Sequence, residues 1–433
     1  TLFKNIITMI NLNQKQEIDE ILDILGENLS ITETQHNAAV QSYKAVGNWL
    51  TNEESELARY SPVISPQGSF IIGTTIQSIN PDDDIDLDVV CELNGKRPDW
   101  TQKDIKELVG DQLRNHKKYE SILDDEGRRC WTLKYRENGN PNERYHMDIL
   151  PAVNTTGYSI ILEKAYSNLK DQSYEDLVLS ITDNERIPEY STSTEPEEWL
   201  QSNPFGYAKW FMNIADNIKG QRTKMFSLNE SVNPTPKYQS ERLPLQRAVQ
   251  LLKRHRDIMF QDYSEDDKKQ KPISCIITTL AAKAYDGEDN IYDALLNIIY
   301  KMEDYIEEKY DFSLMKSVKW ISNPTNEAEN FADRWAIEGS KREQFFNDWL
   351  AKLKADFGGL GNNLNRMNLN ESLIKSFGEA PVTKTFSDLG NRRRVLTESG
   401  GNYIDRKQGV VGAAVAGLTN VAKVSSHNFH GNE

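Results

Sequence analysis

Within the run of residues 82–90, acidic and aliphatic residues alternate from Asp84 to Val89, and this alternation has the period of a β-strand. Successive side chains of a strand point to opposite faces, so Asp86 and Asp88 share one face while Leu87 and Val89 share the other. The apolar face has to be buried in a sheet, which leaves the two carboxylates at an exposed rim. We therefore expect a sheet whose rim carries an oxygen-rich site suited to a divalent metal ion.

A second short signal lies upstream, where Gly68 and Ser69 precede a strand-like apolar run over residues 70–72. The backbone N–H groups of such a Gly-Ser pair can hold phosphate. Phosphate binding beside metal-binding carboxylates is typical of nucleotidyl transfer, and we take this reaction as the working hypothesis.

The acidic run also has simpler interpretations. Acidic runs are often solvated loops, and we expect this of residues 82–84. An EF-hand loop needs glycine at its sixth position and glutamate at its twelfth, and no register of the run supplies both. A single Asp-x-Asp also occurs in metal-dependent glycosyltransferases, so a third carboxylate is needed to separate these classes.

Asp148 is the candidate for that third carboxylate. Residues 129–135 and 144–150 are predicted strands on either side of a turn-rich loop, and the second strand is expected to end at Pro151. A lone aspartate among apolar neighbours is costly to bury unless it is paired or binds metal. An ion pair with Arg144 or Lys134 is the alternative to a carboxylate triad with Asp86 and Asp88.

These segments together resemble the DNA polymerase β-like nucleotidyltransferases, and more narrowly the bacterial cGAS/DncV-like enzymes (CD-NTases) of CBASS anti-phage systems. The resemblance extends over roughly residues 30–360. It rests on Gly68-Ser69, Thr74-Thr75, Asp86-Leu87-Asp88 and His146-Met147-Asp148-Ile149-Leu150-Pro151, and on the later blocks 203–211, 245–257, 271–274 and 323–335.

The resemblance implies an α+β fold with a polymerase β-like nucleotidyltransferase core, in which a mixed sheet packs against helices. A helical C-terminal lobe would complete a bilobed molecule. Helical apolar spacing over residues 32–58 predicts a long N-terminal spine helix. We expect the spine helix and the catalytic lobe in residues 1–200, the helical lobe in residues 201–377, and a flexible tail in residues 378–433.

The metal site implied by the resemblance consists of Asp86, Asp88 and Asp148, which are also the expected catalytic residues. They would hold two Mg²⁺ (or Mn²⁺) ions. Such a pair lowers the pKa of an attacking ribose hydroxyl and neutralises the leaving pyrophosphate. Asp148 is the residue expected to take the proton of that hydroxyl.

The nucleotide-binding residues implied by the resemblance are Gly68, Ser69, Lys253 and Ser274, which would contact the triphosphate. Taken alone, Lys253 is a polar helix residue and Ser274 is a helix N-cap. Cys275 follows that serine where relatives often have a tyrosine that stacks on a base, so the bases recognised are not implied.

The function implied is the condensation of ATP, with or without a second NTP, into a cyclic di- or trinucleotide. This second messenger would act on a downstream effector. Two alternatives stay open at this point: a nucleotidyltransferase that modifies a small molecule, an RNA end or a protein, and an inactive scaffold recognised through its tail.

Charge and cysteine content limit the partners and the location. A net charge of −15 over 433 residues disfavours binding to a nucleic-acid backbone. The three cysteines and six histidines lack zinc-ligand spacing, so we expect no DNA-sensing zinc insertion. An odd, sparse set of cysteines and no visible signal peptide predict a cytoplasmic protein. The apolar residues 409–418 are too few to span a membrane, and we expect no membrane partner.

The tail of the chain is rich in small residues from position 400 onward and contains a basic run at residues 392–394. Its composition predicts a flexible extension. In some CBASS operons an E1/E2-like partner conjugates the C-terminus of the synthase, and an accessible tail fits such a partner. Ending in Asn432-Glu433 after Gly431 departs from the terminal glycine that ubiquitin-like conjugation uses.

Overall fold

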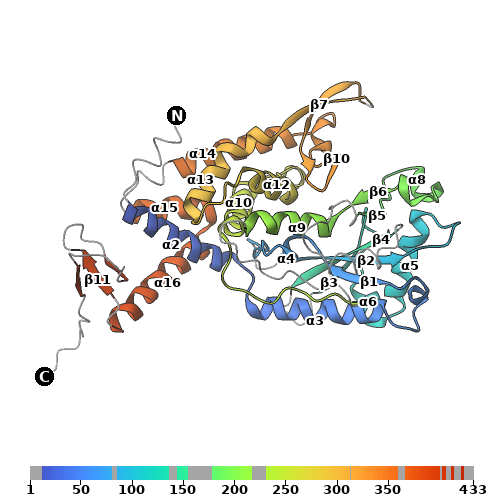
Figure 1. Cartoon of the computed structure of the whole chain (residues 1–433), viewed down its shortest axis with the longest axis horizontal. Helices are drawn as coiled ribbons and strands as arrows, with labels where there is room; N and C mark the ends of the chain where they lie inside the picture. Colours follow the sequence, from blue (N-terminus) through green and yellow to red (C-terminus); the bar gives the residue numbers. More distant parts are fainter. Residues whose placement is uncertain are drawn as a thin grey trace.

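The computed structural model describes residues 12–79, 85–135, 144–154, 178–216, 231–312, 314–358, 366–399, 402–405, 411–413 and 421–423. Two lobes lie end to end in Figure 1. We call the part built around the six-stranded sheet the sheet lobe, and the part built from packed helices the helical lobe. The predicted α+β fold, with a sheet lobe and a helical lobe, is confirmed.

The sheet lobe contains one mixed sheet in the order β1-β2-β4-β5-β6, with β3 paired to β4. Its elements are α3 (Glu33–Leu50), β1 (Val63–Pro66), α4 (Gly68–Ile71), β2 (Ile85–Asn94), α5 (Gln102–Arg114), α6 (Lys117–Ile122), β3 (Trp131–Tyr135), β4 (Tyr145–Asn154), β5 (Leu179–Ile181), α8 (Glu189–Thr192) and β6 (Leu200–Ser202). Strands β2 and β4 are parallel, whereas β1 is antiparallel to β2 and β3 is antiparallel to β4.

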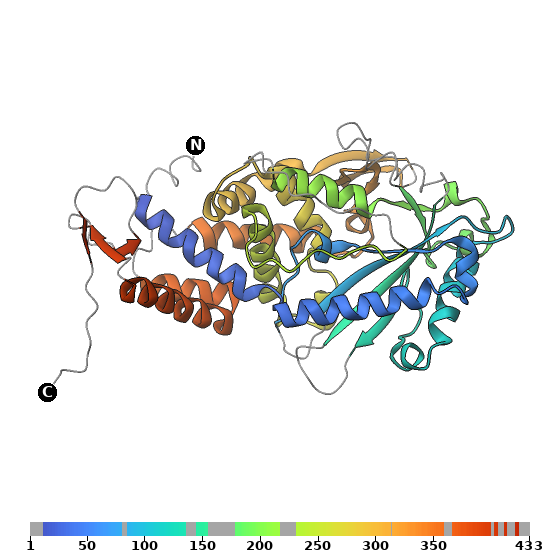
Figure 2. The same cartoon turned by 60° about the horizontal axis from the view of Figure 1, so that its bottom comes forward.

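One face of the sheet is buried against α3, which runs along the sheet in Figure 2. Leu87 and Val89 of β2 are buried there together with Tyr43 and Val46 of α3. The Tyr43 hydroxyl donates to the carbonyl oxygen of Ile64 at 2.8 Å, which ties the helix to β1. Because odd-numbered residues of β2 fill this core, its even-numbered residues lie on the opposite face.

The helical lobe has its own core and includes the first described helix, α2 (Leu12–Leu29). Its other elements are α9 (Pro204–Ala215), α10 (Pro244–Phe260), α11 (Glu265–Lys268), α12 (Ser274–Ala284), α13 (Ile291–Lys301), β7 (Glu307–Asp311), β8 (Lys316–Trp320), β9 (Ser322–Asn323), β10 (Asn326–Asn330), α14 (Arg342–Gly358), α15 (Arg366–Phe377) and α16 (Glu379–Glu398). Beyond them, β11 (Asn402–Asp405), β12 (Val411–Ala413) and β13 (Val421–Lys423) form a small separate sheet. The boundary predicted at residue 200 therefore places α2 in the wrong lobe.

The predicted spine helix is shorter than expected. α3 begins where predicted, because Thr32 and Gln35 form a capping box. It ends at Leu50 rather than near residue 58, since Ser55 accepts a hydrogen bond from the Leu57 N–H and starts a separate short 3₁₀ helix. Together α2 and α3 extend over both lobes as two successive helices, not one.

Two strand predictions in the sheet lobe are wrong in detail. Residues 68–71 form the short helix α4, and the strand precedes Gly68 as β1. Strand β4 continues through Pro151 to Asn154. It can do so because β3 pairs with β4 only as far as Ile149 and β5 pairs only from Ala152. Pro151 lies where β4 changes partner, and its missing N–H removes no ladder bond there.

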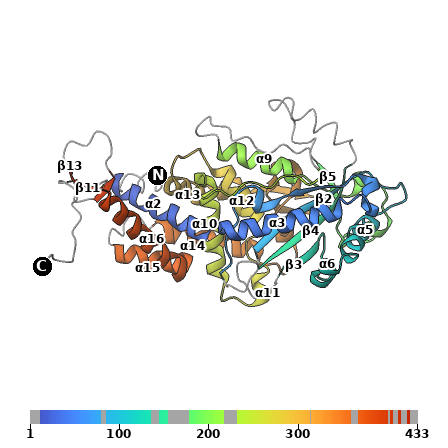
Figure 3. The ribbon, with the colours of Figure 1, turned by 90° about the horizontal axis from the view of Figure 1, so that it is seen from below.

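The prediction of a flexible tail from residue 378 is wrong for residues 379–398, which form α16. This helix lies beside α2 (Figure 3) and buries Val382 and Leu389. Arg392 and Arg393, expected in a flexible extension, pair with glutamates of α2. The final residues 424–433, on which the conjugation prediction depends, lie outside the described residues.

Within the described residues, no helix is both long enough and apolar enough to cross a lipid bilayer.

Candidate active site

The three predicted catalytic acids lie on neighbouring strands of the sheet and on the same face. In the parallel pair β2–β4, Asp88 stands directly opposite Asp148, and Asp86 stands opposite His146. All four are even-numbered residues, on the face away from the α3 core. Two residues further along, Val90 and other even-numbered residues are buried under α9. The acids therefore form a cluster at the rim of this face, as the strand alternation predicted.

Gly68 lies against the acid cluster. An added Cβ atom at this glycine would lie 2.0 Å from Oδ2 of Asp88, and its φ of +64° is one that other residues rarely adopt. The next residue back, Gln67, donates its N–H to the Asp88 carbonyl oxygen at 2.9 Å. The turn that carries Ser69 is thus fixed directly beside the carboxylates, and only glycine allows this approach.

The acid cluster is electrostatically strained in the absence of a cation. Burial and the charges of Asp86 and Asp148 raise the pKa of Asp88 to about 7. Burial also raises the pKa of Asp148, although the Thr132 hydroxyl opposes this by donating to Asp148 Oδ1 at 2.6 Å. Carboxylates that repel one another in this way are stabilised by a divalent cation.

Asp86 is not held in a metal-binding position in this structure, because its carboxylate pairs with His146 of β4. Desolvation acts to raise the pKa of Asp86, but the hydrogen bond and charge of His146 and the charges of Lys253 and Arg256 together outweigh it and lower that pKa. Among the described residues, no three His, Cys, Asp or Glu side chains already enclose a metal position. The charges of the three acids and their positions on adjacent strands fit a divalent ion. To bind it, Asp86 would have to release His146.

Lys253 lies on α10 and reaches the turn that follows Ser69. Its side chain is buried, and Nζ donates to the carbonyl oxygen and the hydroxyl of Thr74 at 3.2 and 3.3 Å. Thr74 in turn donates its N–H to the Ser69 carbonyl oxygen at 2.9 Å, and the hydroxyls of Ser69 and Thr75 are 3.1 Å apart. Burial, with a contribution from the charge of Arg256, lowers the pKa of Lys253 to about 8. A buried, weakly basic lysine beside this turn suits a triphosphate ligand.

The other basic residues that follow Lys253 make contacts inside the protein. Arg254 donates to the carbonyl oxygen of Phe377 at 3.0 Å, and His255 pairs with Asp356 at 2.9 Å. Arg256 pairs with its neighbour Asp257 at 2.8 Å. Of the basic residues 253–256, Lys253 is the one that donates to the Ser69–Thr75 turn.

Ser274 is the first residue of α12, and the N-cap is Ile273, so the prediction that Ser274 caps the helix is wrong. The Ser274 hydroxyl instead accepts a hydrogen bond from Arg256 Nη1 at 3.0 Å. The backbone N–H groups at the start of α12 therefore lack a side-chain cap from Ile273. Cys275 is half-buried, and burial raises the pKa of its thiol to about 12.

Sequence reasoning missed the residues that hold the site in place. Thr132 of β3 stands opposite Asp148, and it could have been found from the antiparallel register of the two strands. Gln246 and Gln250 of α10 donate to the carbonyl oxygens of Ile72 and Thr75 at 2.8 and 2.9 Å. The sequence does not distinguish these glutamines from surface residues. Their acceptors are main-chain carbonyl oxygens in the sheet lobe, and every residue type carries such an oxygen.

Comparisons with known proteins show which proteins the chain resembles. Residues 62–151 match the family model described as "Cyclic GMP-AMP synthase DncV-like, nucleotidyltransferase domain". The chain is 28% identical over 354 residues to a c-di-GMP synthase of Roseivirga ehrenbergii, covering 80% of this chain and 82% of that relative. It is 22% identical over 424 residues to the cyclic dinucleotide synthase CdnG of Bradyrhizobium diazoefficiens, covering 92% and 91%.

A solved structure shows the same fold. The Bradyrhizobium diazoefficiens CD-NTase CdnG in complex with GTP matches with a TM-score of 0.58 at 21% identity, over 86% of this chain and 99% of that chain. This similarity shows the fold, and the family model and the curated relatives make the chain a nucleotidyltransferase. The family match and the curated relatives support a CD-NTase, that is, a cGAS/DncV-like nucleotidyltransferase. The resemblance seen in the sequence is confirmed.

Proposed function

We propose that this enzyme joins two nucleoside triphosphates into a cyclic dinucleotide and releases pyrophosphate. The observation that carries the proposal is the placement of Asp88 opposite Asp148 with the Gly68 turn against Asp88. This arrangement puts a carboxylate cluster and a candidate phosphate-binding turn within one site. The relatives named as cyclic dinucleotide synthases support the cyclic product.

The roles of the residues follow from their positions. Asp86, Asp88 and Asp148 would hold two Mg²⁺ or Mn²⁺ ions, which supply charge neutralisation at the α-phosphate and a lowered pKa of the attacking hydroxyl. Ser69 and the Gly68 backbone would hold the β- and γ-phosphates beside these acids. Lys253 would add a positive charge from the helical lobe, and Ser274 a hydroxyl at the start of α12. Binding the triphosphate in this way orients the α-phosphate for in-line attack.

The names of two similar proteins point to guanine as a base of the product. One is named a c-di-GMP synthase, and the matching CdnG structure is described as a complex with GTP. ATP was expected from the sequence. We propose that at least one GTP enters the product, and we keep ATP as the candidate for a second nucleotide.

The direct test is to incubate the protein with all four NTPs and Mg²⁺ or Mn²⁺, treat with phosphatase, and analyse by mass spectrometry. We expect a phosphatase-resistant cyclic product that contains guanine. A cyclic product without guanine would contradict the base assignment alone. A nucleotide found only on an added small molecule, RNA or protein would support the alternative transferase reaction. No product with either metal and any candidate activator would contradict the proposed function.

Replacing Lys253 by methionine tests the triphosphate role. We expect the KM for NTP to rise about ten- to a hundredfold, because a buried charge-assisted contact is lost. In the native enzyme, kcat/KM should fall as the pH rises through about 8, where the ammonium loses its proton. The variant should lack this fall. Lys283→Met on α12, whose Nζ donates to the Ser322 carbonyl oxygen at 3.2 Å, is the matched control and should keep a native KM.

A role in CBASS anti-phage defence, action through a downstream effector and a cytoplasmic location are part of the same proposal. They follow from the family rather than from particular contacts. Conjugation of the C-terminus by an E1/E2-like partner stays a prediction, because residues 424–433 lie outside the described residues.

A further inference from the structure

The third carboxylate is held by a residue from a different strand. Thr132 of β3 donates its hydroxyl to Asp148 Oδ1 at 2.6 Å, and the two residues are direct partners in the antiparallel β3–β4 register. This bond occupies one oxygen of Asp148. The bond restrains the orientation of the carboxylate and favours Oδ2 as the oxygen that would meet a metal ion.

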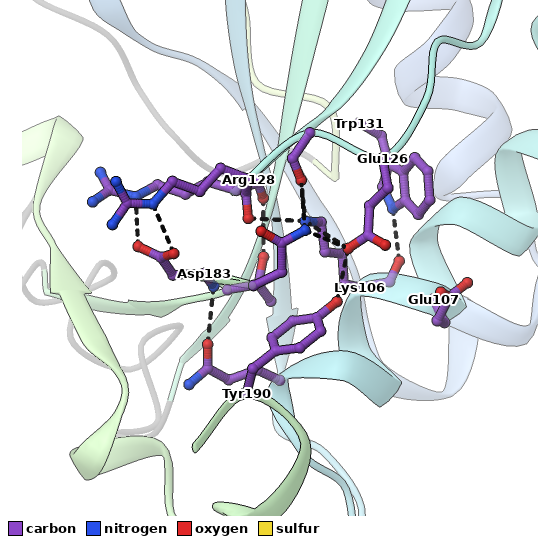
Figure 4. A network of polar contacts seen from close by, with 12 residues as sticks. Lys106, Glu107, Glu126, Arg128, Trp131, Asp183 and Tyr190 are labelled. Atoms are coloured by element: carbon purple, nitrogen blue, oxygen red, sulfur yellow. Dashed lines mark hydrogen bonds and ion pairs between the residues drawn. The ribbon is translucent and has the colours of Figure 1, made fainter. Parts of the chain in front are cut away.

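The segment that leads into β3 is fixed by a buried lysine on α5. The ammonium group of Lys106 belongs to a side chain with 0% exposure, and it donates to the carbonyl oxygens of Gly127 and Arg128 at 2.5 and 3.0 Å. It also pairs with Glu126 at 2.9 Å, which in turn accepts the Tyr190 hydroxyl at 2.9 Å (Figure 4). Displacing a buried cation from three oxygen partners is costly, so Lys106 restrains the position of residues 126–128.

Further bonds continue to the strand itself. The buried carboxylate of Asp183 accepts hydrogen bonds from Nε of Arg128 at 2.8 Å and from Nε of Arg129 at 3.1 Å. Thr182 donates its hydroxyl to the Arg129 carbonyl oxygen at 3.0 Å, and the Trp131 indole donates to the Lys106 carbonyl oxygen at 2.8 Å. Figure 4 shows these contacts converging on the start of β3 from α5 and from the segment that follows β5.

We infer that Thr132 is a positioning residue for Asp148, held in place by this network, and that it sets the affinity of the site for its divalent metal. The inference rests on the proposed function for the identity of the metal site. Groups that hydrogen-bond a metal-binding carboxylate orient it, and their loss typically weakens metal binding about 10- to 100-fold.

The inference is tested by titrating Mn²⁺ into the metal-free protein. Electron paramagnetic resonance measures binding as the loss of the signal of free Mn²⁺. We expect Thr132→Val to raise the Kd for Mn²⁺ about tenfold or more. Thr132→Ser keeps the hydroxyl and should restore Kd to within about twofold. In turnover, Thr132→Val should lower kcat and raise the Mg²⁺ concentration needed for half-maximal rate, with little change in the KM for NTP.

A buried threonine far from the site serves as the control. Thr385 of α16 is 0% exposed and donates its hydroxyl to the Pro381 carbonyl oxygen at 2.8 Å. Thr385→Val should lower the Tm without changing the Kd for Mn²⁺. The inference is overturned if Thr132→Val binds Mn²⁺ like the native protein, if serine does not restore binding, or if Thr385→Val weakens binding equally. A native protein that binds Mn²⁺ but makes no cyclic product would contradict the proposed function. The Kd values of the native protein and the Thr132 and Thr385 variants for Mn²⁺ would still test the role of Thr132.

Discussion

Asp88→Asn is expected to lower the rate of product formation by at least about 10³-fold, since several kcal/mol of charge stabilisation by a metal ion would be lost. The same change should stabilise the metal-free protein. Burial and the charges of Asp86 and Asp148 raise the pKa of Asp88 from its ordinary 3.8 to about 7 in the folded state. The unfolded chain therefore releases this proton first, and stability falls as the pH rises from about 4 to about 7.

Thermal melting of the metal-free proteins across this pH range provides the measurement. The Tm of Asp88→Asn should match the native value near pH 4 and exceed it at pH 8. Added Mg²⁺ should stabilise the native protein and not the variant. Asp111→Asn, which removes an exposed carboxylate paired with Arg114, is the control and should leave activity and pH dependence unchanged. A variant that still forms product would remove Asp88 from the metal site.

Gly68→Ala is expected to reduce product formation by about 10²-fold or more. Its new methyl group would lie 2.0 Å from Asp88 Oδ2, so the carboxylate or the Ser69 turn has to shift, and a displacement of about 1 Å at a reacting centre costs about this much. The positive φ of +64° adds a backbone cost of roughly 1–2 kcal/mol.

Gly95→Ala separates the two effects. Gly95 follows β2 with a φ of +98°, and an added Cβ atom there would meet nothing within 4 Å. Both alanine variants should therefore lose stability to backbone strain, as measured by urea unfolding, but only Gly68→Ala should lose activity. Equal activity in the two variants would show that the close approach of Gly68 to Asp88 has no catalytic importance.

The acid cluster could be predicted because strand alternation fixes which residues share a face. Asp86 and Asp88 had to point away from Leu87 and Val89 once these were buried, and Asp148 followed from the apolar residues around it. The ion pair between Asp86 and His146 could not be predicted from strand alternation. This pair depends on which residues of the parallel strands β2 and β4 stand opposite each other. The sequence of one strand alone does not determine that register.

The wrong predictions share a different cause. Residues 379–398 have the composition of a solvated segment, yet Val382 and Leu389 are spaced by two helical turns and meet a complementary surface on α2. α2 itself was placed with the sheet lobe because it precedes α3 in sequence. In both cases the partner is distant in the chain, so local periodicity gives the element but not its neighbours.

The pairing of α2 with α16 also constrains the order in which the protein can be assembled during synthesis. Arg392 follows its partner Glu27 by 365 residues. At about 5–20 residues per second, the ribosome finishes α16 roughly 20–70 seconds after α2. The sheet lobe is complete in sequence well before that time, so we expect it to fold first. α2 also packs against α10 and α13, which emerge before α16, so we expect these helices to cover part of its apolar stripe first and α16 to close the lobe last.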